Sequence, residues 1–356
     1  MKPRPIHLTF GDYGSETPGS EPFFHDFSGI AAKGCSLWLV SDEGNALDQL
    51  TLQADGSYGA HTRLDLPDYL DLPDDKAELD LESLALGDGS LWLLGSHAAV
   101  RRKIKRETED PEAAIQTLSE VDQSRSRHIL ASLPLSEAGA GCWTPQEKTG
   151  GRKSGALVKI GRKRSKLVKQ LRYDPHLGPF MSIPSKENGF DAEGLAVAGE
   201  RLFVGLRGPV LRGWALVLEL SSEAPKDGRL NLRHLGPEGA FYLKHFLDLD
   251  GMGIRDLTLR GEDLIILAGP TMDLDGPFRL YRWPDALVSA HPTLVERSHL
   301  ERILDLPTVE GADRAEGLTL MEYGGETGFA IVHDKPAAAR RDPVAGHLNL
   351  DFYPLP

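Results

Sequence analysis

The sequence predicts an all-β fold, a β-propeller of five or six four-stranded blades, because one short pattern recurs along its 356 residues. Each copy has a charged turn, an apolar run, a turn with glycine, a second apolar run and a polar cluster. Two apolar runs joined in this way are typical of a β-hairpin. The 38 Gly and 24 Pro, more than the usual share, suit many short strands and turns. The copies lie at residues 25–44, 79–97, 190–208, 253–270 and 314–335.

The spacing of the copies supports a true repeat. Corresponding residues of successive copies, beginning with Gly29, lie 54, 111, 62 and 61 positions apart. Four short strands in every unit of about 40–60 residues are typical of a propeller blade. The interval of 111 residues holds either one blade with a long insertion or two blades, so both counts stay open. Further strand-like runs follow the hairpins at 214–220, 240–249, 278–283 and 300–306.

We expect a single domain over residues 1–356 that is closed by its own N-terminus. The last copy is followed by only one more apolar run, residues 347–355, so its blade lacks one strand. The run at residues 6–10 can supply this strand. Closing the ring in this way removes an open sheet edge, which would otherwise favour aggregation.

An insertion is expected in the second blade, at about residues 98–175. Residues 101–129 have the composition of a helix or a loop rather than of a strand. Residues 148–172 contain ten Lys or Arg and no acidic residue, while the rest of the chain has 30 basic and 53 acidic residues. This basic segment could bind a polyanion or RNA, but only Tyr173 lies beside it to stack on bases. The composition favours the alternative, a solvated loop or one that docks on the acidic surface.

The composition excludes several classes of protein. A net charge of −13 argues against binding nucleic acid or an anionic membrane over the whole surface. Cys35 and Cys142 belong to no CxxC pair, so we expect neither a disulfide framework nor a thiolate zinc site. No apolar run reaches the length of a membrane span, and the start lacks the apolar core of a signal peptide. We therefore expect a cytoplasmic protein. The motifs of serine hydrolases, P-loop NTPases and zincins are absent.

The repeat also predicts a charged site at one mouth of the central channel. In a propeller, the residues before the first strand and after the second strand of each blade converge there, and many of them are ionisable here. Clustered charges cost stability, and folds usually retain them for a ligand, a metal or catalysis. We expect a ring of carboxylates that binds a hard cation, either Ca²⁺ or Mg²⁺. The alternative is structural, with each carboxylate accepting backbone N–H groups of the neighbouring blade. The expected ring consists of Glu82, Glu193, Asp256 and Glu316.

Other ionisable residues of the mouth are candidates for catalysis and for anion binding. His97 and His333 follow the second strands of their copies and, with Asp334, are the candidate general acids and bases. The alternative for each histidine is an ordinary surface position. Four cations are candidates to hold an anionic ligand, and the alternative is that they pair with the carboxylate ring. These cations are Arg207, Arg212, Arg255 and Lys335.

Several segments resemble a known family, and the string RGPVLRGWA is the most specific of them. The segments are 191–197, 205–220, 253–259, 264–270, 315–320 and 331–336. They are similar to the bacterial domain-of-unknown-function family 3616 over nearly the whole chain. This resemblance implies a bacterial, cytoplasmic propeller and no particular activity. A weaker similarity, limited to the pattern D-x-E-G-[LI], is to phytase-like esterases and calcium-dependent lactonases. Those propellers use carboxylates at the channel mouth around a metal, but their remaining ligand patterns are not recognisable here.

Two functions from different classes follow from these observations. The first is a metal-assisted hydrolase of a small anionic ester, lactone or phosphoester, with the carboxylate ring on the cation and Arg207 and Lys335 on the anion. The second is a non-catalytic propeller that binds a ligand or a protein at its charged mouth. A tightly bound divalent ion in the purified protein would favour the first.

Overall fold

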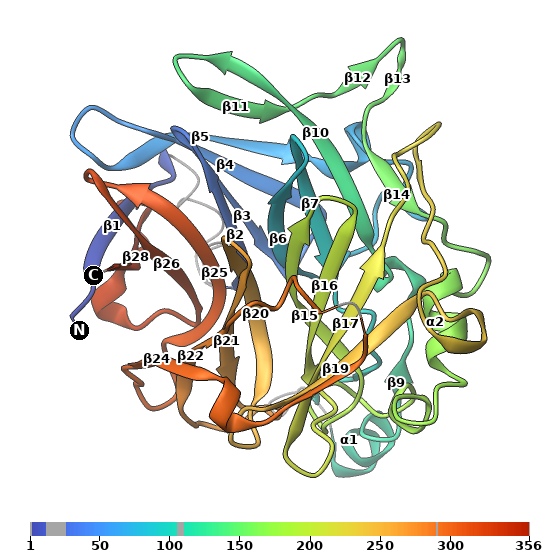
Figure 1. The fold of residues 1–356 in the computed structure, drawn as a ribbon. Helices are drawn as coiled ribbons and strands as arrows, with labels where there is room; N and C mark the ends of the chain where they lie inside the picture. Colours follow the sequence, from blue (N-terminus) through green and yellow to red (C-terminus); the bar gives the residue numbers. More distant parts are fainter. Residues whose placement is uncertain (1, 12–25, 105–109, 290, 356) are drawn as a thin grey trace.

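A ring of inner strands organises the fold (Figure 1). The structure is a computed structural model that describes residues 2–11, 26–104, 110–289 and 291–355. Within these ranges, five inner strands surround a central axis, each in contact with the next, and a sheet extends outward from each of them. The chain is therefore an all-β propeller. The inner strands are β2 (Phe27–Lys33), β6 (Leu81–Gly87), β15 (Asp191–Ala198), β20 (Gly253–Arg260) and β25 (Arg314–Tyr323).

The first two sheets begin at β2 and β6. The first continues through β3 (Ser36–Ser41), β4 (Ala46–Leu52) and β5 (Tyr58–Asp65). The second continues through β7 (Ser90–Gly95), β10 (Leu130–Gly139), β14 (Ala156–Val158) and β18 (Arg229–Leu230), and β11 (Cys142–Pro145) also pairs with β10. Since β18 comes from a loop of the third sheet and pairs in parallel with β14, it fastens two neighbouring sheets together.

The third and fourth sheets begin at β15 and β20. The third contains β16 (Arg201–Gly208), β17 (Trp214–Ser221), β19 (Tyr242–Asp248) and β23 (Thr293–Val295). The fourth contains β21 (Asp263–Gly269), β22 (Phe278–Trp283) and β24 (Glu301–Leu306). Strand β23 leaves the fourth sheet and pairs in parallel with β19, which fastens these two sheets as β18 fastens the earlier pair.

The fifth sheet joins the two ends of the chain. From β25 it continues through β26 (Glu326–Asp334), β28 (His347–Pro354) and β1 (Arg4–Thr9), with β27 (Arg341–Asp342) beside β28. Strand β1 pairs antiparallel with β28 over its whole length, and it also touches β5 of the first sheet at the pair Leu8 and Tyr58. The N-terminal strand thus covers the edge of the fifth sheet and connects it to the first.

Apolar side chains fill the space between neighbouring sheets. Trp38 of the first sheet and Leu93 of the second lie in one buried cluster, and Leu94 of the second sheet shares another with Leu216 of the third. Strands that are covered on both faces read as continuous apolar runs rather than as an alternation. This explains runs such as residues 264–268, which are wholly buried.

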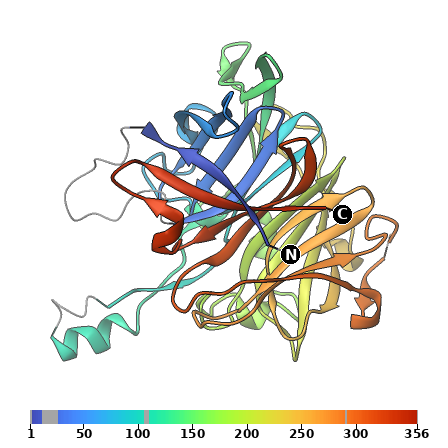
Figure 2. The same ribbon diagram turned by 90° about the vertical axis from the view of Figure 1, so that its left-hand side faces the viewer.

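Most of the segment between β7 and β15 lies outside the regular sheets. It contains α1 (Pro111–Thr117), α2 (Lys166–Leu171) and two small hairpins, and its described residues add no further inner strand. Helix α1 begins at Asp110, whose carboxylate accepts from the backbone N–H groups of Glu112 and Ala113. Figure 2 shows α1 projecting away from the sheets. The hairpins are β8 (Val100–Arg101) with β9 (Val121–Asp122), and β12 (Lys148–Thr149) with β13 (Arg152–Lys153).

Each inner strand carries a β-bulge at the same position near its start. In β6, Leu81 pairs with Gly95 and Ser83 pairs with Leu94, so Glu82 between them has no partner on β7. A bulge re-aims the side chain of the extra residue, and bulges are frequent beside functional sites. The skipped residues of the five strands are Ser28, Glu82, Glu193, Arg255 and Glu316.

The residue after each bulge lies where neighbouring inner strands approach one another. This residue is small in four strands, and a Cβ atom on Gly194 would lie 3.1 Å from the Cα of Asp256 in the next strand. Asp256 is the exception in this row, and it is fully buried. The row consists of Gly29, Ser83, Gly194, Asp256 and Gly317.

The expectation that Asp256 belongs to the carboxylate ring is therefore wrong. The position equivalent to Glu82 and Glu193 is Arg255, and a slip of one residue turns a strand side chain to another direction. The carboxylate of Asp256 accepts from the Ser83 hydroxyl at 2.7 Å and from the backbone N–H groups of Leu257 at 2.8 Å and Leu318 at 2.6 Å. It connects three inner strands, which is the structural alternative that the sequence left open.

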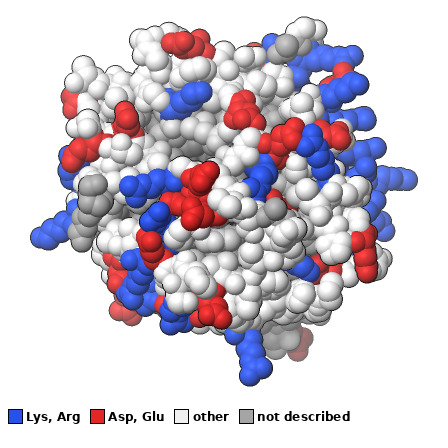
Figure 3. Space-filling model, viewed as in Figure 1, with Lys and Arg blue, Asp and Glu red and all other residues white. Residues whose placement is uncertain are grey.

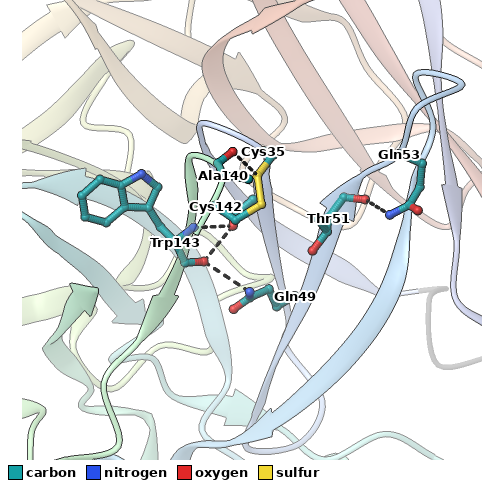
Figure 4. The surroundings of a disulfide bond; sticks show 8 residues. Cys35, Gln49, Thr51, Gln53, Ala140, Cys142 and Trp143 are labelled. Carbon is teal, nitrogen blue, oxygen red and sulfur yellow. Dashed lines mark hydrogen bonds between the residues drawn. A yellow bond between two sulfur atoms is a disulfide. The ribbon is translucent and has the colours of Figure 1, made fainter. Parts of the chain in front are cut away.

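A disulfide bond joins Cys35, in the turn between β2 and β3, to Cys142 at the start of β11 (Figure 4). The two cysteines are 107 residues apart, and no local pattern indicates their pairing. Beside the bond, the side-chain amide of Gln49 donates to the carbonyl oxygen of Trp143 at 3.2 Å. This bond runs against the expectation that the two cysteines form no disulfide framework. Because disulfides persist mainly in oxidising compartments, it does not favour the expected cytoplasmic location.

The helices of the described residues include none that is long and apolar enough to cross a membrane.

Candidate functional site at the channel mouth

A cavity of about 1320 Å³ lies at the end of the inner ring where the bulges occur. Four of the five bulged residues line it, namely Glu82, Glu193, Arg255 and Glu316. The opposite end of the ring has a smaller cavity of about 170 Å³, lined only by Leu, Ala, Val and Thr. Ionisable side chains therefore gather at one mouth of the channel. Strand ends and loops add Asp42, Asp80, Asp191, Arg207, Asp273 and Asp334 to its lining.

Three carboxyl groups meet on the floor of this cavity. One oxygen each of Glu82, Asp191 and Glu193 lies within 4.8 Å of the others. Glu82 comes from the bulge of β6 and is half-buried, while Asp191 begins β15 and Glu193 is its bulged residue. Asp191 and Glu193 are only 1% and 3% exposed. Two neighbouring inner strands thus bring three acidic groups together, two of them almost fully buried.

Two arginines neutralise part of this acidic cluster. Arg207, near the end of β16, lies 2.6 Å from Asp191 Oδ2 through Nη2 and 2.8 Å from Glu193 Oε1 through Nη1. Arg255 lies 3.0 Å from Glu193 Oε2 through Nε and also pairs with Glu316. Both arginines are buried. Of the expected cations, Arg207 and Arg255 therefore pair with carboxylates, as the alternative interpretation had it.

The burial of the cluster shifts the pKa values of its carboxyl groups. Burial raises the pKa of Glu82 well above its usual value, and Glu193 and Asp80 raise it further. Burial also raises the pKa of Asp191 to about 7, although Arg207 acts in the opposite direction. Burial opposes the charge on Arg207, but Asp191 and Glu193 outweigh it and raise the pKa of that guanidinium. Burial thus disfavours the charged form of both carboxyl groups even with the arginines in place.

Two carboxyl groups of the cluster have oxygen atoms open to a further ligand. Asp191 Oδ1 is buried and has no hydrogen-bond partner among the described residues. The carboxyl group of Glu82 also has no hydrogen bond or ion pair to the part of the chain that the structure describes. Oxygen ligands with negative charge are what Ca²⁺ and Mg²⁺ prefer. The donor set therefore fits a hard divalent cation, with Glu193 as the third carboxylate.

The rim of the cavity carries both basic and acidic side chains. Lys103 and Lys186 are exposed on the rim and form no ion pair with described residues. Arg127 pairs with Asp80 at 3.3 Å and with Asp122 at 2.8 Å. The two lysines come from the insertion and from the loop before β15. They could attract an anion toward the acidic floor.

The two candidate catalytic histidines do not line this cavity. His333 lies in β26 and pairs with Ala315, the residue before the bulge of β25. In the second sheet the residue before the bulge pairs with Gly95 of β7, so Gly95 is the equivalent of His333. His97 lies two residues beyond that position. His333 is buried, 3.6 Å from Asp351 through Nε2. His97 lies in a different pocket, where its ring stacks with that of His128. Their predicted equivalence is therefore wrong.

The other predicted residues have different locations. Asp334 lines the mouth, as does Glu316. Arg212 is exposed in the turn between β16 and β17, and Lys335 follows β26; neither residue lines the cavity. Asp191 was not among the predicted metal ligands, although the spacing D-x-E occurs at both 80–82 and 191–193 and could have indicated it.

Comparison with known proteins gives a family. Residues 26–348 match the family model described as "Protein of unknown function (DUF3616)". None of the curated proteins matches. Among solved structures, exo-beta-1,3-galactanase from Phanerochaete chrysosporium is similar at 10% identity and a TM-score of 0.42, over 99% of this chain and 64% of the galactanase chain. An alpha-L-arabinanase mutant from Cellvibrio cellulosa is similar at 10% identity and a TM-score of 0.40, over 94% of this chain and 92% of that chain. This chain thus spans less than two thirds of the galactanase.

Proposed function

The chain belongs to the family of proteins of unknown function DUF3616, whose name assigns no activity, and we propose that its channel mouth is the active site of a metal-assisted hydrolase. The substrate class is a small anionic ester, lactone or phosphoester. The observation that carries the proposal is the open donor set on the cavity floor, where Asp191 Oδ1 is buried without a partner beside Glu82 and Glu193. The cation would be Ca²⁺ or Mg²⁺.

The residues around the cation have separate tasks in this proposal. Glu82, Asp191 and Glu193 would hold the ion, and Arg207 and Arg255 fix the orientation of Asp191 and Glu193 by their ion pairs. When bound, a divalent cation polarises an ester or phosphoryl oxygen and activates water. The exposed rim lysines would attract the negative charge of the substrate, and the cavity of about 1320 Å³ leaves room for a small molecule.

A second candidate function is a non-catalytic module that binds an anionic ligand or a protein at the same mouth. The ion pairs of Arg207 and Arg255 favour it, because they already neutralise part of the acidic cluster without any cation. In that case no cation is needed at Glu82, whose charged form burial disfavours by raising its pKa.

Hydrolysis assays with a matched pair of variants test the proposal. We expect turnover of p-nitrophenyl phosphate, p-nitrophenyl acetate or a small lactone when Ca²⁺ or Mg²⁺ is present, and loss of this turnover with a chelator. Glu82→Gln keeps the size of the side chain but removes the charge of a ligand. Mutating a residue that only orients a metal ligand lowers metal affinity or activity by about 10–100-fold. Because Glu82 would bind the metal directly, we expect kcat/KM to fall by at least about 100-fold.

Glu322→Gln is the control, since Glu322 is exposed on β25 outside the mouth and loses the same charge. It should retain the turnover of the parent protein. Turnover that survives both the chelator and Glu82→Gln would contradict the proposed site. No turnover of any of the three substrates, together with no effect of the cations, would favour the binding module.

A further inference from the structure

A second cavity, of about 260 Å³, lies on the insertion and shares no lining residue with the mouth. Its walls come from three segments: the stretch after β7, the stretch before β10, and residues around α2. It belongs to the basic part of the surface. Figure 3 shows Lys and Arg gathered along the right-hand edge of the molecule, where Figure 1 places β12–β14 and α2.

The lining of this basic pocket contains five cations and no acidic residue. The chain as a whole carries a net charge of −13, so the local excess of positive charge opposes the overall balance. With the residues that the structure describes, none of the five side chains forms an ion pair, and only the Arg125 side chain donates a hydrogen bond, to the carbonyl oxygens of Pro73 and Arg162. The five cations are Arg125, Arg162, Lys163, Arg164 and Arg172.

Two stacked histidines form another part of the wall. The rings of His97 and His128 are 5.6 Å apart, and both side chains are about 95% buried. His97 Nδ1 lies 2.7 Å from the Gly95 carbonyl oxygen, so this nitrogen carries a hydrogen and donates. His128 Nδ1 is buried and has no partner among the described residues. A buried polar nitrogen without a partner points to a group that is still to bind.

Burial lowers the pKa values of both rings. Burial lowers the pKa of His97 to about 4. Burial lowers the pKa of His128 to about 3, and the positive charges of His97, Arg164 and Arg127 contribute to the shift. Both rings are therefore neutral at neutral pH. An anion in the pocket would offset the repulsion among Arg164, Arg172 and their neighbours.

We propose that this basic pocket binds a phosphoryl group, either as free phosphate or as a phosphomonoester. Guanidinium groups from several elements match the oxygen atoms of a tetrahedral dianion, and the volume suits one such group. The lining contains no Phe, Tyr or Trp on which bases could stack, which favours a small phosphorylated molecule over RNA. The pocket is a binding site separate from the proposed active site.

Calorimetric titration with inorganic phosphate at constant ionic strength tests the proposal. We expect saturable binding of one phosphate to the full chain, weakened at least about tenfold by Arg164→Ala and by Arg172→Ala, because each removes charge-assisted hydrogen bonds. Lys159→Ala is the matched control, since Lys159 is exposed in the same basic segment but does not line the pocket. It should change the Kd by less than about twofold.

Further titrations distinguish the sources of the phosphoryl group and the two sites. Glycerol phosphate binding more tightly than phosphate would identify a monoester as the ligand, and the reverse would identify free phosphate. Glu82→Gln should leave this binding unchanged, because Glu82 belongs to the mouth. Three results would overturn the proposal: no saturable binding, equal weakening by Lys159→Ala and Arg164→Ala, or tighter binding of a single-stranded RNA that depends on Lys159. If Arg164→Ala does not fold, Arg164→Lys and Arg172→Ala supply the same comparison.

Discussion

Replacing Asp256 with alanine is expected to lower the free energy of unfolding by about 3–5 kcal/mol, because it leaves two backbone N–H groups and a hydroxyl unpaired in the centre of the ring. Asp256 is fully buried and accepts from Ser83, Leu257 and Leu318, which belong to three inner strands. Burial raises the pKa of this carboxyl group well above its usual value, and the hydrogen bonds partly oppose the effect. Urea denaturation measures the change.

Two further variants make the result specific to the buried contacts. Asp65→Ala removes an exposed carboxylate at the end of β5 and should stay within about 0.5 kcal/mol of the parent protein. Asp256→Asn keeps one acceptor oxygen and should fall between the two. If Asp256→Ala changed stability by less than about 1 kcal/mol and abolished binding of a cation, the role of Asp256 as an anchor would be contradicted.

Replacing Arg207 with alanine is expected to lower the free energy of unfolding by about 3–5 kcal/mol at pH 8, because it removes the ion pair of the buried Asp191 and leaves Glu193 with Arg255 alone. The pKa of Asp191 is already raised, to about 7, and removing Arg207 raises it further. A group with a raised folded-state pKa loses its stability contribution as the pH rises through that value. The cost should therefore shrink when the pH is lowered from 8 to 5.

Arg212→Ala is the control for this experiment. Arg212 belongs to the same string of sequence as Arg207 but is exposed, so its loss should matter by no more than about 0.5 kcal/mol at either pH. Urea denaturation of both variants at pH 5 and pH 8 gives the comparison. The electrostatic account of the mouth would be contradicted if Arg207→Ala lost the same free energy of unfolding at both pH values. It would also be contradicted if Arg207→Ala and Arg212→Ala lost equal amounts.

The repeat pattern predicted most of the fold, because each copy is a hairpin that can bury its apolar faces only against neighbouring copies. It also placed Glu82, Glu193 and Glu316 at equivalent positions, and the structure shows all three at the mouth. The same reasoning failed at Arg255 and Asp256. The bulged residue faces the mouth in four of the five inner strands, and in β20 this residue is Arg255 rather than Asp256. Sequence periodicity does not reveal which of two adjacent residues forms the bulge.

Other features depend on contacts between distant segments. The pairing of Cys35 with Cys142 requires the turn after β2 to meet the hairpin of β10 and β11, and nothing local in the sequence indicates this meeting. His97 and His333 appeared equivalent because each follows an apolar run, but only the strand register shows the offset of two residues between them. The basic pocket likewise forms only when the stretch around His128 folds against α2.

The melting temperature with and without a chelator tests the central claim, a divalent cation held by Glu82, Asp191 and Glu193 at the channel mouth. A ligand at 100 times its Kd stabilises the folded state by about 2.7 kcal/mol, which for a chain of this size corresponds to about 4 °C. We therefore expect chelation to lower the melting temperature of the parent protein by about this amount, Ca²⁺ or Mg²⁺ to restore it, and Glu82→Gln to show no response. An unchanged melting curve after chelation, with no metal found by elemental analysis of the purified protein, would contradict the claim.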